Sequence, residues 1–278
     1  MNTARLGTED KRTYDCLNIE LIRRHLDTDT VGTQMLLFWQ VASTNQTLRQ
    51  LAEAGAREGT VVLAETQTAG RGRLGKIWFS PVGVNLYASV LFRPSLPTRE
   101  VGAFSLISSL ALSEAMWAEG AAAGIKWPND IVIDGRKVAG TLVTCASGGD
   151  VVDYVILGVG ANLNVDRPTL DEALGKEAAL ATSLGEAAAQ TIDRNTFTAA
   201  FLNLLEKWFL AYQQYGAAGV LAPWRDRDVL CGRTVAVVEA GRRYQGCVVG
   251  IDNEGRLEVV DAHGIRRQVV AGEIRPLD

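Results

Sequence analysis

A stretch rich in glycine and arginine, AGRGRLGKIW at residues 69–78, combines groups that could bind an anion. Glycine lets backbone N–H groups approach a ligand closely, and arginine offers a planar fork of donors that matches phosphate or carboxylate. Gly70, Gly72 and Gly75 spell G-x-G-x-x-G, the dinucleotide pattern, while Gly70, Gly75 and Lys76 spell the P-loop pattern G-x-x-x-x-G-K. The stretch therefore indicates either a site for phosphate or carboxylate, or a basic loop that is merely solvated.

Neither nucleotide pattern stands in its usual context. Both require a helix directly after the last glycine, whereas Pro81 and Gly83 oppose a helix here. Ile77 also occupies the position at which a P-loop places the Ser or Thr that holds magnesium. The sequence therefore predicts a strand–loop–strand unit, and we expect the empty loop to be mobile because glycines and like charges do not order themselves.

Three later stretches carry polar groups at the ends of apolar runs. KWPND at 126–130 combines a cation, an aromatic ring, a rigid turn, an amide and a carboxylate. GRKVAG at 135–140 places Lys137 at the start of an apolar strand, where a half-buried ammonium needs an anionic partner. GVGANLN at 158–164 ends a strand with small residues and two amides. Taken alone, the first and third stretches could each be an ordinary turn.

The composition limits the chemistry that is available. The chain has 278 residues, a formal charge of −4 and only two histidines, His25 and His263. Both histidines lie in a predicted helix end or turn, which argues against a Ser-His-Asp or Cys-His mechanism and against a histidine metal site. The four cysteines are scattered without a C-x-x-C pair, which is typical of reduced thiols in the cytoplasm. Reactions must therefore depend on lysine, arginine and carboxylate groups.

The overall charge and the apolar runs also bear on partners. An acidic chain has no general affinity for nucleic acid. The N-terminus mixes charges without an apolar core, and no uninterrupted apolar run approaches the ~20 residues that span a bilayer. We therefore expect a cytoplasmic protein that binds neither DNA nor a membrane.

The elements that must position these groups do not alternate regularly. Apolar and β-branched runs predict strands, and three- and four-residue spacing of apolar residues predicts helices. The predicted strands are 35–42, 60–65, 83–94, 124–127, 151–164 and a hairpin over 131–146 that turns at Asp134-Gly135. The predicted helices are a brief one at 19–26 and longer ones at 43–55, 97–120 and 193–216. This order favours an α+β fold, a mixed β-sheet with packed helices, over a doubly wound one.

The pattern of the sequence changes near residue 230. Short strand-like runs separated by Gly, Asp and Asn turns predict a small barrel of about 50 residues. We therefore divide the chain into a short N-terminal extension (1–36), a main domain (37–229) and a C-terminal barrel (230–278).

Five motifs in this order resemble the biotin protein ligases. They are STN at 43–45, Q-T-A-G-R-G-R-x-G-x-x-W at 67–78, KWPND, RKVAG and G-x-G-x-N. Members of that family activate biotin with ATP and attach it to a lysine of a carboxylase carrier domain. The resemblance runs from about Phe38 to the C-terminus, and it implies a mixed-sheet catalytic domain of the biotin/lipoate ligase kind with an SH3-like C-terminal domain.

The resemblance also assigns roles to residues. It implies biotin contacts from Ser43, Thr44, Asn45, Gln67, Arg71, Gly72, Arg73 and Lys137. It implies nucleotide contacts from Arg71, Arg73, Trp78, Asn129, Asp130, Lys137 and Asn162. Arg73, Lys126 and Lys137 would be the catalytic cations. ATP and Mg²⁺ would act as substrate and activator, without a tightly bound metal, and the motif does not say which residue touches magnesium. The resemblance is compatible with a homodimer.

Two departures from the family pattern and two alternatives remain. Leu74 and Ile77 stand where many relatives carry basic residues, so the loop is less charged here. Some relatives carry an N-terminal winged helix-turn-helix, and the roughly 36 residues that precede the catalytic domain are too few for one, so we expect a ligase without a DNA-binding arm. A lipoate or octanoate ligase is the closest alternative, and a non-catalytic biotin-sensing regulator is another.

Overall fold

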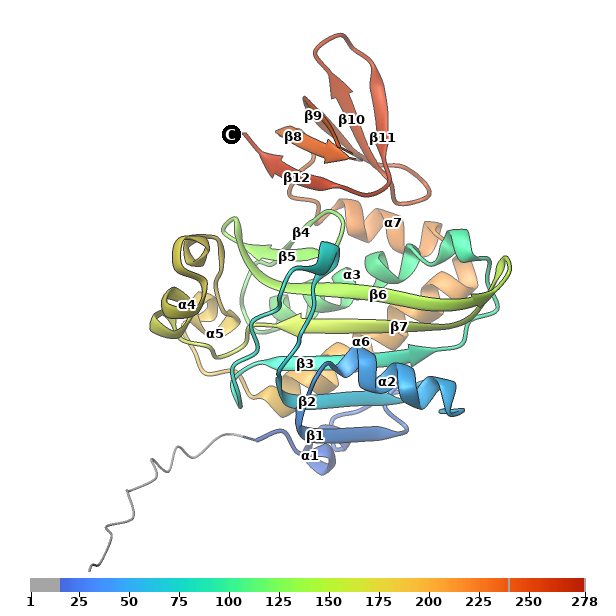
Figure 1. Ribbon diagram of the computed structural model, residues 1–278, viewed down its shortest axis with the longest axis vertical. Coiled ribbons are helices and arrows are strands. Elements are labelled where there is room, and N and C mark those ends of the chain that lie inside the picture. Colours follow the sequence, from blue (N-terminus) through green and yellow to red (C-terminus); the bar gives the residue numbers. More distant parts are fainter. Residues whose placement is uncertain (1–15, 240, 278) are drawn as a thin grey trace, which may run out of the picture.

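The computed structural model describes residues 16–239 and 241–277, so most of the predicted extension lies outside the described residues. A seven-stranded sheet forms the larger part of the molecule (Figure 1). Its strands are β1 (Met35–Val41), β2 (Val61–Gln67), β3 (Leu86–Phe92), β4 (Gly124–Lys126), β5 (Asp130–Ile133), β6 (Arg136–Gly148) and β7 (Val151–Ala161). Their order is β1-β2-β3-β7-β6-β5-β4. Only β1 and β2 are parallel to each other, so the sheet is mixed, as predicted.

Helices cover both faces of this sheet. Helix α2 (Thr44–Glu53) lies on one face, over β2 and β3, while α3 (Ala103–Ala118) and α6 (Arg194–Tyr215) pack behind it (Figure 1). Phe92 of β3 joins the two rear helices to the sheet, because its ring centre lies 5.1 Å from that of Phe104 and 4.7 Å from that of Phe209. By length and hydropathy alone the segment Thr98–Ala118 could cross a membrane, but 61% of that stretch is buried, as in the core helix of a globular domain.

The shorter elements sit at the edges. They are α1 (Ile19–Arg23), α4 (Arg167–Leu174), α5 (Leu184–Ala188), α7 (Ala218–Arg225) and the 3₁₀ turns η1 (Arg73–Gly75), η2 (Thr98–Glu100) and η3 (Gly175–Leu180). The described part of the predicted extension packs on the main core, since Leu17, Ile22 and Val31 are buried there.

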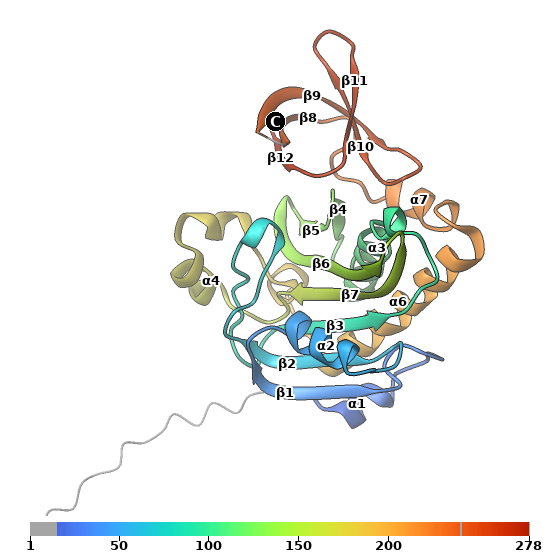
Figure 2. The same cartoon turned by 45° about the vertical axis from the view of Figure 1, so that its right-hand side comes forward.

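A second sheet follows α7. Its strands are β8 (Thr234–Glu239), β9 (Arg242–Ile251), β10 (Leu257–Asp261), β11 (Arg266–Val269) and β12 (Glu273–Pro276). They pair antiparallel in the order β11-β10-β9-β8-β12 and lie beyond the β4–β5 end of the large sheet (Figure 2). The predicted α+β class with a small C-terminal β domain is confirmed. Closure into an SH3-like barrel and the limits at 36/37 and 229/230 stay predictions.

A buried ion pair holds the end of β2 to the start of α6. Arg194 Nη2 lies 2.7 Å from Glu65 Oε2, and the two side chains are 1% and 4% exposed. Arg194 Nε also donates to the Asn85 carbonyl, and Glu65 Oε1 accepts from the Leu17 backbone N–H. The pair thus joins four segments, and Glu65 lies two residues before Gln67, one of the predicted site residues, in β2.

We expect Arg194→Met to lower the free energy of unfolding by about 3–5 kcal/mol, because it leaves the Glu65 carboxylate buried without its cation. Urea unfolding measures the change. The control is Arg49→Met, which removes an ion pair to Glu53 whose side chains are 68% and 53% exposed and which should barely move the unfolding midpoint. Equal midpoints for the two variants would contradict the anchoring role of Arg194.

Candidate functional site

The STN motif and Gln67 meet on the α2 face of the sheet. Ser43 is the N-cap of α2 and its side chain makes no capping hydrogen bond. Gln67 ends β2, and its Oε1 accepts from the Thr44 backbone N–H at 2.9 Å. The Ser89 hydroxyl of β3 lies 2.6 Å from Asn45 Oδ1 and 2.8 Å from Thr44 Oγ1. The predicted biotin side of the site is therefore a connected polar cluster.

Two glycines of β7 make room for this cluster and for Trp78. A Cβ atom on Gly158 would overlap the amide of Asn45, and one on Gly160 would overlap the indole of Trp78. The predicted G-x-G pattern thus has a steric cause: two side chains from other segments lie directly on the β7 backbone.

A second cluster contains the predicted catalytic groups. Lys137 Nζ lies 2.5 Å from Asp130 Oδ1 and 5.3 Å from the centre of the Trp78 ring. The β5–β6 hairpin brings the lysine and the aspartate together, since it turns at Asp134-Gly135 as predicted. The Trp78 Nε1 atom is buried against Gly160 of β7 and has no hydrogen-bond partner among the described residues.

The KWPND motif adjoins this cluster. Arg73 Nη1 donates to Asn129 Oδ1 at 3.2 Å, so the glycine-arginine loop contacts the motif directly. Burial lowers the pKa of Arg73, and the nearby Asp130 carboxylate opposes that shift. Lys126 and Asp130 are cross-strand neighbours in the β4–β5 pair, and the Asp130 charge raises the pKa of Lys126. The three predicted catalytic cations, Arg73, Lys126 and Lys137, therefore lie near one carboxylate, and Lys137 forms an ion pair with it.

The pKa of Lys126 reflects its burial and the charges around it. Burial is the main cause that lowers its pKa. The positive charges of Lys137, Arg275 and Lys76 lower it further, while Asp130 raises it. A site that gathers this much positive charge around one carboxylate is suited to a polyanion such as a nucleotide triphosphate.

The loop between β2 and β3 is a small hairpin that lies across the face of the sheet (Figures 1 and 2). Arg71 and Ile77 form a β-bridge, and the Gly72 N–H donates to the Lys76 carbonyl at 2.7 Å. Leu74 at the tip has φ 55°. No α-helix follows the glycines, so the expected strand–loop–strand unit is confirmed. Mobility of the empty loop stays a prediction.

The side chain of Asn162, another predicted site residue, forms hydrogen bonds within the protein. Its Nδ2 donates to the Thr182 carbonyl at 3.1 Å, and its Oδ1 accepts from Asn85 Nδ2 at 3.4 Å. The side chain is only 8% exposed. The amide thus holds two turns together beside the site, and its contact with a nucleotide stays a prediction.

The sequence reasoning missed Ser89 and Glu273. Ser89 is the one small hydroxyl residue in the buried strand LYASVLF, and this could have marked it. Glu273 of β12 lies 2.8 Å from Lys76 Nζ, and this ion pair lowers the pKa of Glu273. No local pattern indicates a contact between segments so far apart in the chain.

Within residues 16–239 and 241–277, the structure gathers no group of three His, Cys, Asp or Glu side chains that could hold a metal ion. Magnesium commonly uses one or two carboxylates together with the phosphates of its substrate. Asp130 is the carboxylate of this cluster, but its Oδ1 pairs with Lys137, and the Oδ1 of the neighbouring Asn129 already accepts from Arg73. Magnesium would therefore enter on the phosphates of its nucleotide, and no residue is assigned as its ligand.

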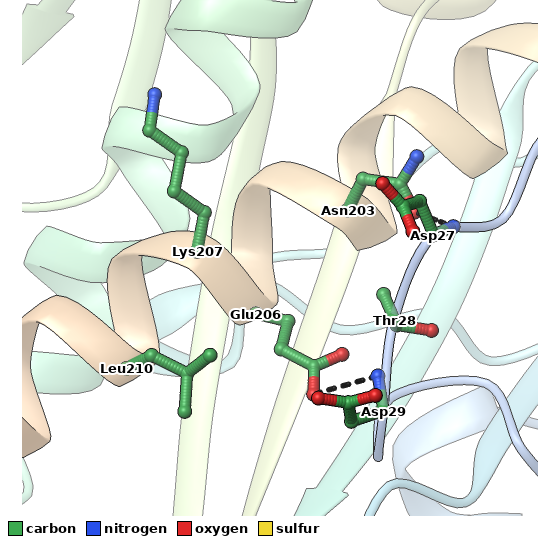
Figure 3. A pocket seen from close by; sticks show the side chains of 7 residues that line it. All are labelled: Asp27, Thr28, Asp29, Asn203, Glu206, Lys207 and Leu210. Carbon is green, nitrogen blue, oxygen red and sulfur yellow. Dashed lines mark hydrogen bonds between the residues drawn. The ribbon is translucent and has the colours of Figure 1, made fainter.

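Two hollows lie apart from these clusters. One, of about 260 Å³, lies between residues 27–29 and α6 (Figure 3). Glu206 accepts there from the backbone N–H groups of Asp29 and Thr30, at 3.2 and 2.9 Å. Its acidic lining does not suit a nucleotide. The other, of about 400 Å³, lies beside residues 226–229.

Comparison with known proteins agrees with this geometry. Residues 37–162 match the model of the Biotin/lipoate A/B protein ligase family, and residues 230–275 match the Biotin protein ligase C terminal domain. The biotin–[acetyl-CoA-carboxylase] ligase of Mycobacterium tuberculosis is 32% identical over 94% of this chain and 97% of that protein. The chain belongs to the biotin protein ligase family.

Other members of the family show how far the likeness extends. The bifunctional ligase/repressor BirA of Bacillus subtilis is 32% identical over 88% of this chain and 75% of its own length. The biotin protein ligase of Aquifex aeolicus, solved in complex with biotin and ATP, has a TM-score of 0.73 at 24% identity and covers 88% of this chain and 98% of that one. This likeness shows a shared fold.

Proposed function

We propose that this biotin protein ligase joins biotin to AMP, using ATP, and then transfers biotin to a lysine of a carboxylase carrier domain. The observation that carries the proposal is the placement of Lys137 between Asp130 and Trp78. This cluster lies on the same sheet as the polar cluster around Thr44 and Gln67. Family membership supplies the substrate, because the M. tuberculosis relative is named a biotin–[acetyl-CoA-carboxylase] ligase.

The first step needs positive charge. The biotin carboxylate must approach the α-phosphate of ATP, and two unit charges about 4 Å apart repel by roughly 4 kcal/mol at an effective dielectric of ~20. Lys137, Arg73 and Lys126 would offset this repulsion and the charge that develops on phosphorus. The carboxylate oxygen forms the new bond to phosphorus, and pyrophosphate leaves.

The second step needs the intermediate to survive. The carrier lysine attacks the carbonyl of the mixed anhydride, AMP leaves, and an amide forms. A loop that excludes water protects the anhydride until then. Arg73 is suited to hold the loop down, since its guanidinium contacts Asn129 across the site.

We expect Arg73→Gly to release biotinyl-AMP and to raise biotin labelling of bystander proteins about tenfold or more, because the loop loses its contact with Asn129. Streptavidin blotting of a mixture with unrelated proteins measures the labelling. Leu74→Gly is the matched control, since Leu74 is 72% exposed and has a φ that glycine adopts easily. Bystander labelling by Arg73→Gly at the level of this control would count against the closing role of Arg73.

The substrate class can be tested separately. We expect ATP-dependent pyrophosphate release with biotin and little with lipoate or octanoate. Faster release with lipoate or octanoate would favour the related ligases, and no release with any of them would favour a biotin-sensing regulator.

The partners and the compartment complete the proposal. The protein would bind ATP as its magnesium complex and would act on a carrier domain in the cytoplasm. It would have no DNA or membrane partner, and the proposal is compatible with a homodimer. A gel shift at physiological salt tests the expectation for DNA.

A further inference from the structure

The segment that connects α7 to the C-terminal sheet extends the edge of the large sheet. Residues 227–229 run parallel to β4, with a bridge between Ile125 and Asp228. The Ile125 N–H donates to the Arg227 carbonyl at 2.8 Å, and the Val229 N–H donates to the Ile125 carbonyl at 3.1 Å. Because β4 is the last strand of the sheet, this segment pairs with its outer side.

The fit between the segment and β4 is close. A Cβ atom on Gly124 would overlap the Val229 side chain and would lie 3.4 Å from the Arg227 carbonyl oxygen. Gly124 has no positive φ, so a glycine is needed here for room and not for backbone conformation. The contact between β4 and the connecting segment therefore depends on the side chains at positions 124 and 229, which can be changed independently.

Trp127 and Pro128, which follow Ile125, are also bonded to other parts of the chain. The indole Nε1 of Trp127 donates to the Gly255 carbonyl, in the turn between β9 and β10, at 2.9 Å. The Ser105 hydroxyl of α3 donates to the Pro128 carbonyl at 2.8 Å. Ile125 and Trp127 are 0% and 3% exposed. Three separate parts of the chain therefore fix the segment 125–128.

Lys126 lies between the two buried anchors. Successive side chains of a strand point to opposite faces, and Lys126 is directly opposite Asp130 in the β4–β5 pair. A shift of Ile125 or Trp127 would therefore move the Lys126 ammonium relative to Asp130 and Lys137.

We propose that the connecting segment 227–229 and the Gly255 turn position Lys126 for the phosphates of ATP. The connecting segment then acts on adenylation through the backbone of Ile125, and the C-terminal sheet acts on it through the indole of Trp127. Both are positioning residues, because they act through Lys126. This inference rests on the proposed function for its substrate, ATP.

Gly124→Ala tests the inference, because its methyl group must push Val229 and the connecting segment away from β4. We expect KM for ATP in biotinyl-AMP formation, and the Kd for ATP measured by calorimetry, to rise about tenfold or more, since a displacement of ~1 Å near a reacting group can cost 10²-fold. The Kd for biotin should stay within about twofold of the wild-type value, because the STN cluster lies elsewhere.

The double variant Gly124→Ala with Val229→Ala is the matched control. It removes the methyl groups that collide, so it should restore most of the affinity for ATP. Trp127→Phe is a second probe if Gly124→Ala does not fold, because it keeps an aromatic ring and loses the N–H donated to Gly255. We expect it to raise the Kd for ATP several-fold without changing the Kd for biotin.

Two results would overturn the inference: unchanged affinity for ATP in the folded single variants, or equal losses for ATP and biotin that the double variant does not restore. Failure of the proposed function looks different. If the proposed function is wrong, the wild-type protein forms no biotinyl-AMP. The calorimetric Kd for ATP of the variants, compared with that of the wild-type protein, still tests whether the segment 227–229 and the Gly255 turn position Lys126. A wild-type protein that does not bind ATP would overturn both.

Discussion

We expect Lys137→Ala to form biotinyl-AMP about 10²–10³-fold more slowly than the wild-type protein. Removing one preorganised group that stabilises developing charge has an effect of this size. The Lys137 ammonium lies 2.5 Å from Asp130 Oδ1 and 5.3 Å from the centre of the Trp78 ring. Single-turnover assays with biotin and radiolabelled ATP measure the rate of adenylate formation directly.

The fold should tolerate this change. The Lys137 side chain is 37% exposed, and the hydrogen bond from the Thr182 N–H to Lys137 uses the backbone carbonyl. Arg136→Ala is the matched control, because that neighbouring side chain pairs with Glu186 at 2.7 Å, away from the cluster. A wild-type rate in Lys137→Ala would rule out the assigned role.

We expect Gly158→Ala to weaken biotin binding by about 10²-fold. The added methyl group would overlap the Asn45 amide, and the amide must then leave its contact with Ser89. A displaced Asn45 amide that loses two hydrogen bonds to biotin, each of about 1–1.5 kcal/mol, would weaken the Kd by roughly this factor. Titration calorimetry with biotin measures it.

Gly148→Ala is the matched control for this variant. A Cβ atom there would lie 3.7 Å from Asp153 Oδ1, which is an ordinary contact, so the affinity for biotin should not change. If Gly158→Ala bound biotin as tightly as Gly148→Ala, the cluster around Thr44, Asn45 and Ser89 would not be the biotin site.

The sequence was informative where residue type and position alone limit the structure. Pro81 and Gly83 oppose a helix after the glycine-arginine loop, and the chain does continue into β3. Asp134-Gly135 predicts a hairpin, and both residues have positive φ values, 49° and 73°. That hairpin then brings Lys137 back to Asp130, an anionic partner of the kind that its apolar neighbours require.

The features that were missed depend on tertiary contacts. The resemblance to the biotin protein ligases implies that Asn162 contacts a nucleotide, but the sequence does not show that the Asn162 amide already bonds to Thr182 and Asn85. One of the short strand-like runs predicted after residue 230, IRRQVVAGEI at 265–274, divides into β11 and β12. Gly272 fits between them because a Cβ atom would lie only 2.7 Å from the Val238 carbonyl oxygen. The pairing of residues 227–229 with β4 likewise links segments about 100 residues apart, which no local pattern indicates.

One measurement tests the central claim most directly. The protein is incubated with biotin, ATP, magnesium and an isolated carboxylase carrier domain, and the mass of the carrier is then determined. The account predicts that the carrier gains one biotinyl group at a single lysine, that the gain requires ATP, and that Lys137→Ala nearly abolishes it. An unmodified carrier with the wild-type protein, or full modification by Lys137→Ala, would contradict it.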